Sequence, residues 1–443
     1  MLAVSLIGGH EKTGVALAGY LNLPPPTQTY STNMKLLAEQ ATTEARRSMQ
    51  QAADEVKAIQ GRDIRVSVDG TWQRRGYSSK QGVVTVLSNL GQNESNKVID
   101  TEVLSTFCHT CLQTNNDNIK LSTIKKGHTC AKNHDGSAGS MEVAGAVKIF
   151  GRSKDQYGLQ YTEYLGDGDS KAYATVASSN IYSKPISKLE CCGHIQKRMG
   201  KALMRLVDDN KSKVFIVNQA GVHITSKTVP NKSRGERLYR GIGGQGRLTS
   251  KAIKSIQGHY GAAIRNNADI SSMKADILAI LQHRKGLHES CPEWCPSHRG
   301  NMDAANKSRL PMFVCKLMEP VFEYLSSDEL LSKCVHGGTQ NANESFHNLI
   351  WKHCPKGIFA GITRIQLGVS IATIMFNDGA RGMLGLYNHC GLRVGRHLID
   401  YVDKKDTLRV KKADIACKDT TKAKRKASSY RNAATNDYEA GAF

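Results

Sequence analysis

Three consecutive β-type segments between residues 63 and 105 constrain the fold more than any other feature of this sequence. Residues 63–69 (DIRVSVD) alternate apolar and polar side chains, and residues 82–88 (GVVTVLS) and 97–105 (KVIDTEVLS) are rich in β-branched residues. Short polar segments separate them, as in an antiparallel meander. The sequence therefore predicts a sheet in which at least three neighbouring strands are antiparallel.

The pattern that follows alternates between helix and strand. Residues 136–158 form an amphipathic helical pattern, residues 161–165 a fourth strand, and residues 186–192 a fifth strand that leads into a helix over 196–207. The predicted order β-β-β-α-β-α-β-α is that of an α/β, ribonuclease-H-like fold. In that fold a mixed sheet carries acidic residues at the ends of neighbouring strands.

Composition divides the rest of the chain around this sheet. We expect five parts: an N-terminal helical region over 1–61, a first part of the sheet domain over 62–208 with a Cys/His-rich insertion at 106–135, a polar and basic all-helical insertion over 209–333, a last part of the sheet domain over 334–402, and a loosely ordered basic tail over 403–443. The helix expected after residue 339 takes Thr339 as its N-cap.

Three acidic residues stand in settings that suit metal-dependent chemistry. Asp69 ends the first predicted strand, Asp167 ends the fourth with Asp169 two residues on, and Glu344 opens a late helix. A single Asp after a strand is usually a turn residue, but three acids in this order can converge. Carboxylate oxygens suit Mg²⁺ or Mn²⁺, and a pair of such ions supports in-line displacement at a phosphodiester.

The chain carries 61 Lys and Arg against 39 Asp and Glu, a formal net charge of +22. A field of this sign attracts polyanions, and nucleic acid is the commonest intracellular one; a basic protein that needs only solubility, or one bound to ribosomes, is the alternative. No segment is apolar for the roughly 18 residues a membrane span needs, so we expect no membrane contact and mostly reduced cysteines. A basic run near the C-terminus favours the nucleus. The candidate phosphate contacts are Arg74, Arg75, Lys171, Lys197, Arg198 and Lys201.

Cysteine and histidine cluster in two places. Cys108 and Cys111 form a Cys-x-x-Cys pair, and His128, Cys130 and His134 follow with spacing that suits zinc. Among these five candidates we favour the set Cys108, Cys111, His128 and Cys130. A second cluster around Trp294 is a weaker zinc candidate and comprises His283, His288, Cys291, Cys295 and His298.

Five blocks resemble successive signature blocks of the Mutator-like transposase family. They read VSVDGTWQRRGYSS, GSAGSMEVAGAVKIF, YTEYLGDGDSKAY, KLECCGHIQKRMGKAL and HGGTQNANESFHNLIW, and the likeness extends from about residue 20 to the closing YEAGAF. The resemblance implies a DDE transposase whose ribonuclease-H-like catalytic domain is interrupted by a helical insertion. Its triad of acids falls on Asp69, Asp167 and Glu344, with Asp169 as the alternative second acid.

The resemblance has further implications. It implies metal-dependent DNA cleavage and strand transfer at transposon ends, by a homodimer or larger assembly on DNA. It also places a Cys-x-x-His pair on Cys191 and His194, where Cys192 is an alternative to Cys191. We expect this pair to support the active-site strand and to be a candidate metal-ligand pair, and a buried thiol beside a hydrogen-bonded histidine is the alternative. No separate DNA-binding module is evident before Asp69, which keeps open a domesticated or decayed descendant that binds DNA without cutting it. A ribonuclease H or junction nuclease would leave the helical insertion and the NANESFH block unexplained.

Overall fold

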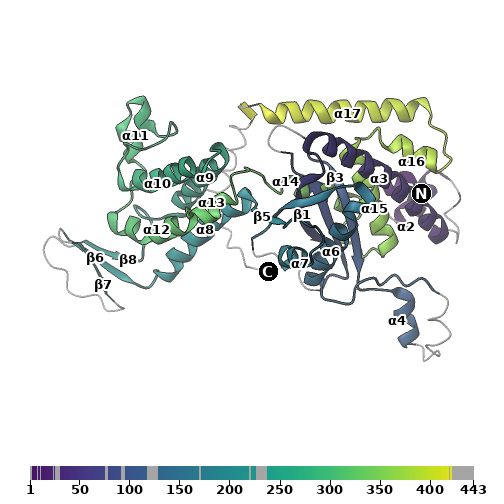
Figure 1. The fold of residues 1–443 in the computed structure, drawn as a ribbon, viewed down its shortest axis with the longest axis horizontal. Helices are drawn as coiled ribbons and strands as arrows, with labels where there is room; N and C mark the ends of the chain where they lie inside the picture. Colours follow the sequence, from purple (N-terminus) through teal and green to yellow (C-terminus); the bar gives the residue numbers. More distant parts are fainter. Residues whose placement is uncertain are drawn as a thin grey trace. The chain divides into compact units, whose positions relative to one another are not determined.

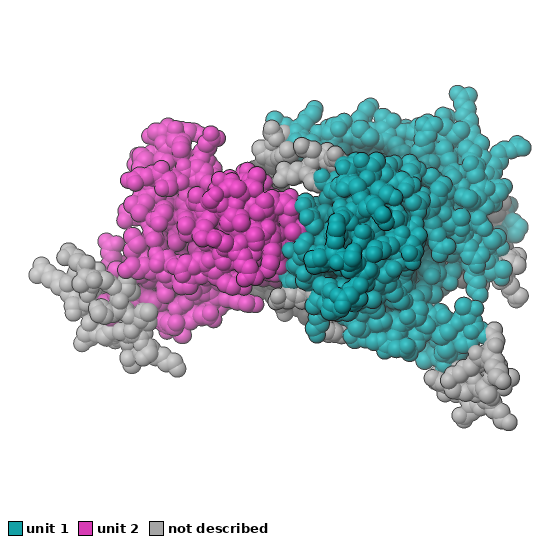
Figure 2. All heavy atoms as spheres, in the orientation of Figure 1, with its two compact units in different colours: residues 1–188, 340–443 teal, residues 189–339 magenta. Residues whose placement is uncertain are grey.

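The computed structural model forms two compact units: residues 1–188 with 340–443, and residues 189–339 (Figure 2). We call them the sheet unit and the insertion unit. The structure describes residues 2–6, 8–9, 11–22, 24, 30–74, 78–90, 95–116, 128–168, 171–218, 221–225, 237–418 and 420–421.

A five-stranded mixed sheet in the order β3-β2-β1-β4-β5 is the centre of the sheet unit (Figure 1). Strands β1 (Asp63–Trp72), β2 (Gln81–Ser88) and β3 (Val98–Ser105) form the expected antiparallel meander. Strand β4 (Gln160–Gly166) pairs in parallel with β1, and β5 (Ser187–Glu190) is the edge strand. The meander prediction is confirmed, and β1 is the central strand.

Helix α6 (Ala138–Tyr157) covers one face of this sheet. It begins where Ser137 caps the amide of Ser140 and ends at Gly158, whose left-handed backbone (φ 64°) closes the helix. Its Gly145 packs directly on the sheet, because a Cβ there would clash with Val84. Its buried apolar residues Met141, Ile149 and Phe150 join the sheet core.

The opposite face is covered by α14 (Asn341–His353), α15 (Ile362–Asn377) and α3 (Tyr30–Gln60). Alternation along β1 divides its side chains between the two helical layers. The Trp72 indole N–H donates to the Ala138 carbonyl at 2.9 Å on the α6 side, whereas Thr71 accepts from the Trp351 indole at 2.8 Å on the α14 side. Trp72 is therefore part of the packing under α6.

The remaining helices of the sheet unit correct two expectations. Helix α17 (Arg396–Cys417) continues through residue 403, so the tail expected to be loosely ordered from there is helical to Cys417. Helix α14 has Gln340 as its N-cap residue, not Thr339. The other helices are α1 (Leu2–Leu6), α2 (Glu11–Tyr20), α4 (His109–Asn116), α7 (Lys171–Ser178) and α16 (Met383–His389).

The insertion unit is mostly helical and has its own apolar core. Helix α8 (Cys192–Asp209) packs on α9 (Ser250–Asn266) and on α12 (Met312–Leu325), and α10 (Ile270–Lys285) packs on α9 and α12. Thr249 and Asp269 cap the first turns of α9 and α10. Short elements complete the unit: η1 (Pro296–Arg299), α11 (Met302–Asn306) and α13 (Asp328–Ser332).

The expectation of an all-helical insertion over 209–333 was wrong. A three-stranded antiparallel sheet, in the order β7-β6-β8, lies within it. Strand β6 (Val214–Asn218) and strand β7 (Gly221–Thr225) are rich in β-branched residues, which fit a pleated surface. Strand β8 (Arg237–Arg240) is polar and basic, and only its pairing with β6 makes it a strand. Its own four residues carry too weak a signal to reveal it.

Among the described residues, no helix combines the length and the apolar character that crossing a membrane requires.

Candidate functional site

Asp69 lies inside the central strand β1, three residues before its end at Trp72, and not at the end of the strand as expected. Its side chain is about one-third exposed (32%). It shares the α14 face with Ser67 and Thr71, because side chains two apart in a strand point the same way. The Asp69 carbonyl accepts the Thr85 hydroxyl at 3.2 Å, which ties this position to β2. The first acid is thus held rigidly while its carboxylate remains accessible.

The parallel pairing of β1 with β4 brings Asp167 to the same region. Ser67 pairs with Leu165, so Asp69 and Asp167 each stand two residues beyond a paired position. Neighbouring strands are only about 4.8 Å apart, and Asp167 follows the last residue of β4 and is exposed. The expected parallel pairing of the strand that carries Asp69 with the strand that precedes Asp167 is confirmed. Asp169 lies outside the described residues.

Helix α14 brings Glu344 to this part of the sheet. The Gln340 side-chain amide donates to the Val68 carbonyl at 2.8 Å, and the Asn343 amide donates to the Ser67 carbonyl at 3.2 Å. These two bonds fix the first turn of α14 on the backbone beside Asp69. Glu344 is in this turn and is exposed. The helix that carries the third predicted acid therefore returns to the central strand after the insertion.

His347, one turn further along α14, contacts the first acid. Its Nδ1 lies 3.6 Å from Asp69 Oδ2, and its Nε2 lies 2.9 Å from Thr85 Oγ1. Burial, with a smaller effect of the Lys356 charge, lowers the pKa of His347 to about 3. The ring is therefore neutral at pH 7, and the Asp69 contact is not an ion pair despite its short distance.

Glu142 on α6 is a fourth acid that the sequence reasoning missed. Burial and the neighbouring Asp167 carboxylate raise its pKa, while Lys188 lowers it. Its Cγ would lie 3.2 Å from a Cβ placed on Gly70, the residue after Asp69. Glu142 thus lies next to Gly70 on the α6 face of the sheet, where Asp167 affects its pKa. In the sequence it reads as one polar position of an amphipathic helix, so only the packing of α6 on the sheet reveals it.

The carboxylates carried by β1, the end of β4, α14 and α6 are of the kind that a hard divalent cation binds. Asp69, Asp167, Glu344 and Glu142 offer carboxylate oxygens, the ligands that Mg²⁺ and Mn²⁺ prefer. Among the described residues, ligand atoms within 4.8 Å of one another occur in two groups of three or more, and both are Cys/His clusters. The acids are therefore spaced more widely than a closed site. An open arrangement of this kind fits ions that keep water and take phosphate oxygens as further ligands.

The first Cys/His group is the set favoured from the sequence: Cys108, Cys111, His128 and Cys130. We call it the insertion cluster, after the Cys/His-rich insertion at 106–135, which is part of the sheet unit and not of the insertion unit. His128 Nε2 lies 3.6 Å from Cys108 Sγ and 3.3 Å from Cys111 Sγ, and the Sγ atoms of Cys111 and Cys130 are 3.6 Å apart. The fifth candidate, His134, instead contacts Ser140 Oγ at 2.8 Å in the first turn of α6. The structure thus separates the fifth candidate from the other four.

The insertion cluster can supply a thiolate readily. Burial raises the pKa of Cys108, but the backbone amides of Cys111 and Ala131 and the His128 side chain lower it, to about 6 overall. The Cys130 thiol raises the pKa of Cys111 to about 11, because two thiolates side by side repel. A cation among the sulfurs would remove that repulsion. The donor set of three sulfurs and one imidazole fits zinc.

Cys191 and His194 occupy the first turn of α8, where the His194 amide donates to the Cys191 carbonyl at 2.9 Å. Neither belongs to a metal-ligand group within the described part of the chain. Cys192, the alternative to Cys191, points into the core of the insertion unit and donates its thiol to the Cys334 carbonyl at 3.6 Å. A structural role in starting α8 is what these contacts support.

The basic candidates differ in how free their charges are. Arg74 and Lys171 are exposed in the sheet unit, and Lys197 and Lys201 are exposed on α8. Arg198 is half-buried, and its guanidinium lies 3.5 Å from the Glu190 carboxylate. Part of its charge is therefore neutralised within the protein. Arg75 lies outside the described residues, as do the basic residues from 422 onward.

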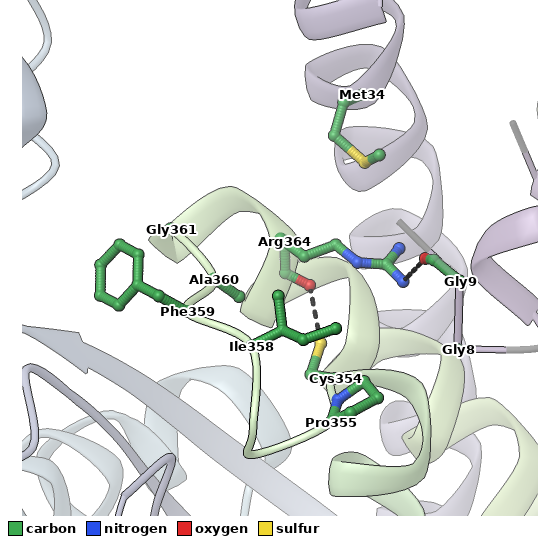
Figure 3. A pocket seen from close by; sticks show the side chains of 10 residues that line it. All are labelled: Gly8, Gly9, Met34, Cys354, Pro355, Ile358, Phe359, Ala360, Gly361 and Arg364. Carbon is green, nitrogen blue, oxygen red and sulfur yellow. Dashed lines mark hydrogen bonds between the residues drawn. The ribbon is translucent and has the colours of Figure 1, made fainter. Parts of the chain in front are cut away.

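A pocket of about 200 Å³ in the sheet unit is separate from this chemistry. Figure 3 shows Ile358 and Pro355 on its wall and the Arg364 guanidinium turned toward Gly9, to whose carbonyl it donates at 2.6 Å. The Cys354 thiol donates to the Arg364 carbonyl at 3.2 Å. The described residues that line this pocket include no carboxylate.

Comparison with known proteins gives the family. The model of the Mutator-like transposase family matches residues 1–295, about two thirds of the chain, and the chain therefore belongs to that family. No curated protein and no solved structure gives a match. The matched segment includes Asp69, Asp167 and both Cys/His clusters, and it ends before α14 and Glu344. Membership implies a transposase-related function with DNA as the partner.

Proposed function

We propose that this chain is an active DDE-type DNA transposase that cleaves DNA strands at transposon ends and joins them to target DNA. The observation that carries the proposal is the convergence on the central strand. Asp69 on β1, the end of β4 before Asp167, and the first turn of α14 with Glu344 meet there through strand pairing and two side-chain hydrogen bonds. This arrangement supports Asp69, Asp167 and Glu344 as the catalytic acids.

The sheet topology supports a ribonuclease-H-like catalytic domain. Its order β3-β2-β1-β4-β5, with β1 antiparallel to β2 and parallel to β4, follows the predicted order of elements. In such a sheet the acids belong on the central strand, on its parallel neighbour and on a helix that follows an insertion. The chain has each of the three, so the fold and the acids support one another.

The protein's own residues would bind and orient the reacting groups. Mg²⁺ or Mn²⁺, when bound, would activate the attacking water or 3′-hydroxyl and stabilise the leaving oxygen. Asp69 pairs with Thr85 of β2, which fixes its backbone in the sheet. The Gln340 and Asn343 side-chain amides bond the first turn of α14, which carries Glu344, to the backbone of β1. His347 is neutral and buried, which keeps an additional positive charge away from the cation.

DNA would be held mainly by charge. The net charge of +22 supports phosphate contacts, and the exposed cations Arg74, Lys171, Lys197 and Lys201 are the candidates that the structure describes. Structural zinc in the insertion cluster would fix the start of α4 to residues 128–130. A nuclear location and assembly as a dimer or larger oligomer on DNA complete the proposal.

A cleavage assay tests the proposal. The full chain is incubated with labelled duplexes that carry the terminal repeats flanking its gene, with Mg²⁺, with Mn²⁺ or with EDTA. We expect metal-dependent nicking that Asp69→Asn, Asp167→Asn and Glu344→Gln each abolish while DNA binding persists. Asp155→Asn, an exposed acid on α6, is the matched control and should cleave normally. Binding without cleavage by the wild-type chain, with either metal, would indicate a decayed or domesticated descendant instead.

A further inference from the structure

The insertion unit contains a second, more deeply buried Cys/His group, at the end of α10. His283 is on the last turn of the helix, and His288, Cys291 and Cys295 are in the segment that follows. We call these four residues the α10 cluster. None of them is more than 8% exposed. A buried set of two thiols and two imidazoles is expensive to maintain unless its polar atoms have partners.

The distances within the α10 cluster are those of a tetrahedral site. His283 Nδ1 lies 3.6 Å from Cys291 Sγ and 3.4 Å from Cys295 Sγ, and the corresponding distances from His288 Nδ1 are 3.8 and 3.6 Å. Zinc–nitrogen and zinc–sulfur bonds at tetrahedral angles put N and S roughly 3.6 Å apart. All four N–S distances lie close to that value. The two Nδ1 atoms are 3.0 Å apart.

Both imidazoles are oriented by their other nitrogen. His288 Nε2 lies 3.2 Å from Asn306 Oδ1, and His283 Nε2 lies 2.7 Å from Ser308 Oγ. An oxygen acceptor at Nε2 fixes the proton there and leaves the Nδ1 lone pair free, which is the usual arrangement around a metal-bound histidine. With both rings in this tautomer, two lone pairs face each other across 3.0 Å, and a cation between them relieves the repulsion.

The remaining histidine of the sequence cluster has a different partner. His298 Nε2 lies 2.5 Å from the Cys291 carbonyl, so this ring holds the loop backbone and leaves four ligands. Four protein ligands close the coordination sphere, and closed sites are structural, whereas catalytic zinc keeps an open position. We propose that the α10 cluster binds one structural zinc ion through His283 Nδ1, His288 Nδ1, Cys291 Sγ and Cys295 Sγ.

A zinc ion would stabilise the loop after α10, which has only a small apolar core. Apart from Trp294, the apolar group under this loop consists of Cys291, Cys295 and Ala305. Trp294 contacts the His283 ring edge-on at 4.9 Å and the tilted His259 ring at 4.0 Å, measured between centroids. Zinc would therefore fix the end of α10, the loop to η1 and the position of Trp294 together.

Zinc counting in the full chain tests the proposal. The variant Cys108→Ser/Cys111→Ser disables the insertion cluster, so any zinc that remains reports the α10 cluster. We expect about one zinc ion per chain in this variant. Adding Cys291→Ser and Cys295→Ser should remove it. Adding Cys315→Ser, another buried cysteine of the same unit, or His298→Ala should not. A Cys108→Ser/Cys111→Ser protein that retains no zinc would overturn the proposal.

A spectroscopic measurement avoids dependence on how the four-serine variant folds. The Cys108→Ser/Cys111→Ser protein is stripped of metal and loaded with Co²⁺ alone. A tetrahedral site with two sulfurs and two nitrogens should give intense visible d–d bands and a thiolate charge-transfer band in the near ultraviolet. These bands should vanish when one equivalent of zinc is added. The absence of both kinds of band, with Co²⁺ left in solution, would show that the cluster is only a hydrogen-bonded pair of histidines beside two thiols.

Discussion

His347 Nδ1 lies 3.6 Å from the Oδ2 atom of Asp69, and this contact joins the late helix α14 to the central strand of the sheet. The Thr85 hydroxyl donates to the Asp69 carbonyl, so His347 Nε2 must carry the proton in its own bond to Thr85. The unprotonated Nδ1 then faces the carboxylate. Two electron-rich atoms at this distance favour a bound cation, and the neutral ring adds no competing charge.

Replacing His347 by alanine should weaken metal-dependent cleavage more than DNA binding. The substitution removes the ring beside Asp69 and its bond to Thr85, and loss of an orienting partner typically costs roughly 10- to 100-fold in metal affinity or activity. The measurement is cleavage rate against Mg²⁺ concentration, where half-saturation should move upward. Asn348→Ala, the exposed neighbour on α14, is the control. An unchanged Mg²⁺ dependence would remove His347 from the site.

Stability should fall as the pH decreases from about 6.5 to 4. Burial lowers the pKa of His347 to about 3 and that of His353 to about 4, so the unfolded chain binds protons in this window that the folded chain does not. For His353 alone, the shift from 6.5 amounts to about 3 kcal/mol lost between pH 7 and pH 4. Urea unfolding at several pH values should show a weaker pH dependence in His353→Gln than in the wild type. Equal slopes would mean that this ring is not buried and neutral.

Replacing Glu142 by glutamine should stabilise the metal-free protein at neutral pH while weakening Mg²⁺ binding. Burial and Asp167 raise the pKa of Glu142 from 4.5. Ionising this carboxyl therefore costs folding free energy, and the cost is absent at low pH and builds up as the pH rises from 4.5 through the folded pKa. Thermal unfolding in EDTA should show a higher Tm for Glu142→Gln at pH 7, with the gain shrinking toward pH 4. Asp155→Asn should show no such gain. A lower Tm for Glu142→Gln than for the wild type at pH 7 would contradict a carboxylate whose ionisation costs folding free energy.

Removing the insertion cluster should release zinc and unfold only its own segment. Structural zinc contributes roughly 10 kcal/mol or more to local folding, and Cys108→Ser or Cys111→Ser removes one of the four ligands. We expect the zinc content to fall by one ion per chain while the sheet unit keeps a cooperative transition. Cys417→Ser, an exposed cysteine at the end of α17, is the control. Wild-type protein without zinc, in which the thiols of Cys108, Cys111 and Cys130 are all freely alkylated, would rule this site out.

DNA binding should be steeply dependent on salt. A chain with net charge +22 that contacts several phosphates should lose affinity by orders of magnitude between about 50 and 200 mM salt. Lys201→Ala should reduce the slope of log affinity against log salt by about one. Arg198→Ala should reduce it less, since Glu190 already neutralises part of that charge. A flat salt profile for the wild type would mean that the positive charge serves another purpose.

Local patterns in the sequence were sufficient for the antiparallel meander and for helix α6. Alternation over residues 63–105 predicted β1 to β3, and the helical pattern from residue 136 predicted α6, because period and burial are encoded within a few neighbouring residues. The Cys-x-x-Cys spacing likewise identified the insertion cluster. Element ends were less certain: β1 continues past Asp69 to Trp72, since pairing with β2 extends the strand beyond its apolar stretch.

The tertiary structure alone decided which distant side chains meet. Register between β1 and β4 pairs Ser67 with Leu165, two residues before Asp69 and Asp167, and the Gln340 and Asn343 bonds hold α14 on the same strand. Contacts of this kind depend on how whole elements pack, and no local period records them. The same reason explains why Glu142 and His347 were not expected at the acids and why β8 was overlooked. The sequence by itself thus determined the meander, helix α6, the candidate acids and the insertion cluster. Packing determined the neighbours of Asp69 and which histidines remain in each Cys/His group.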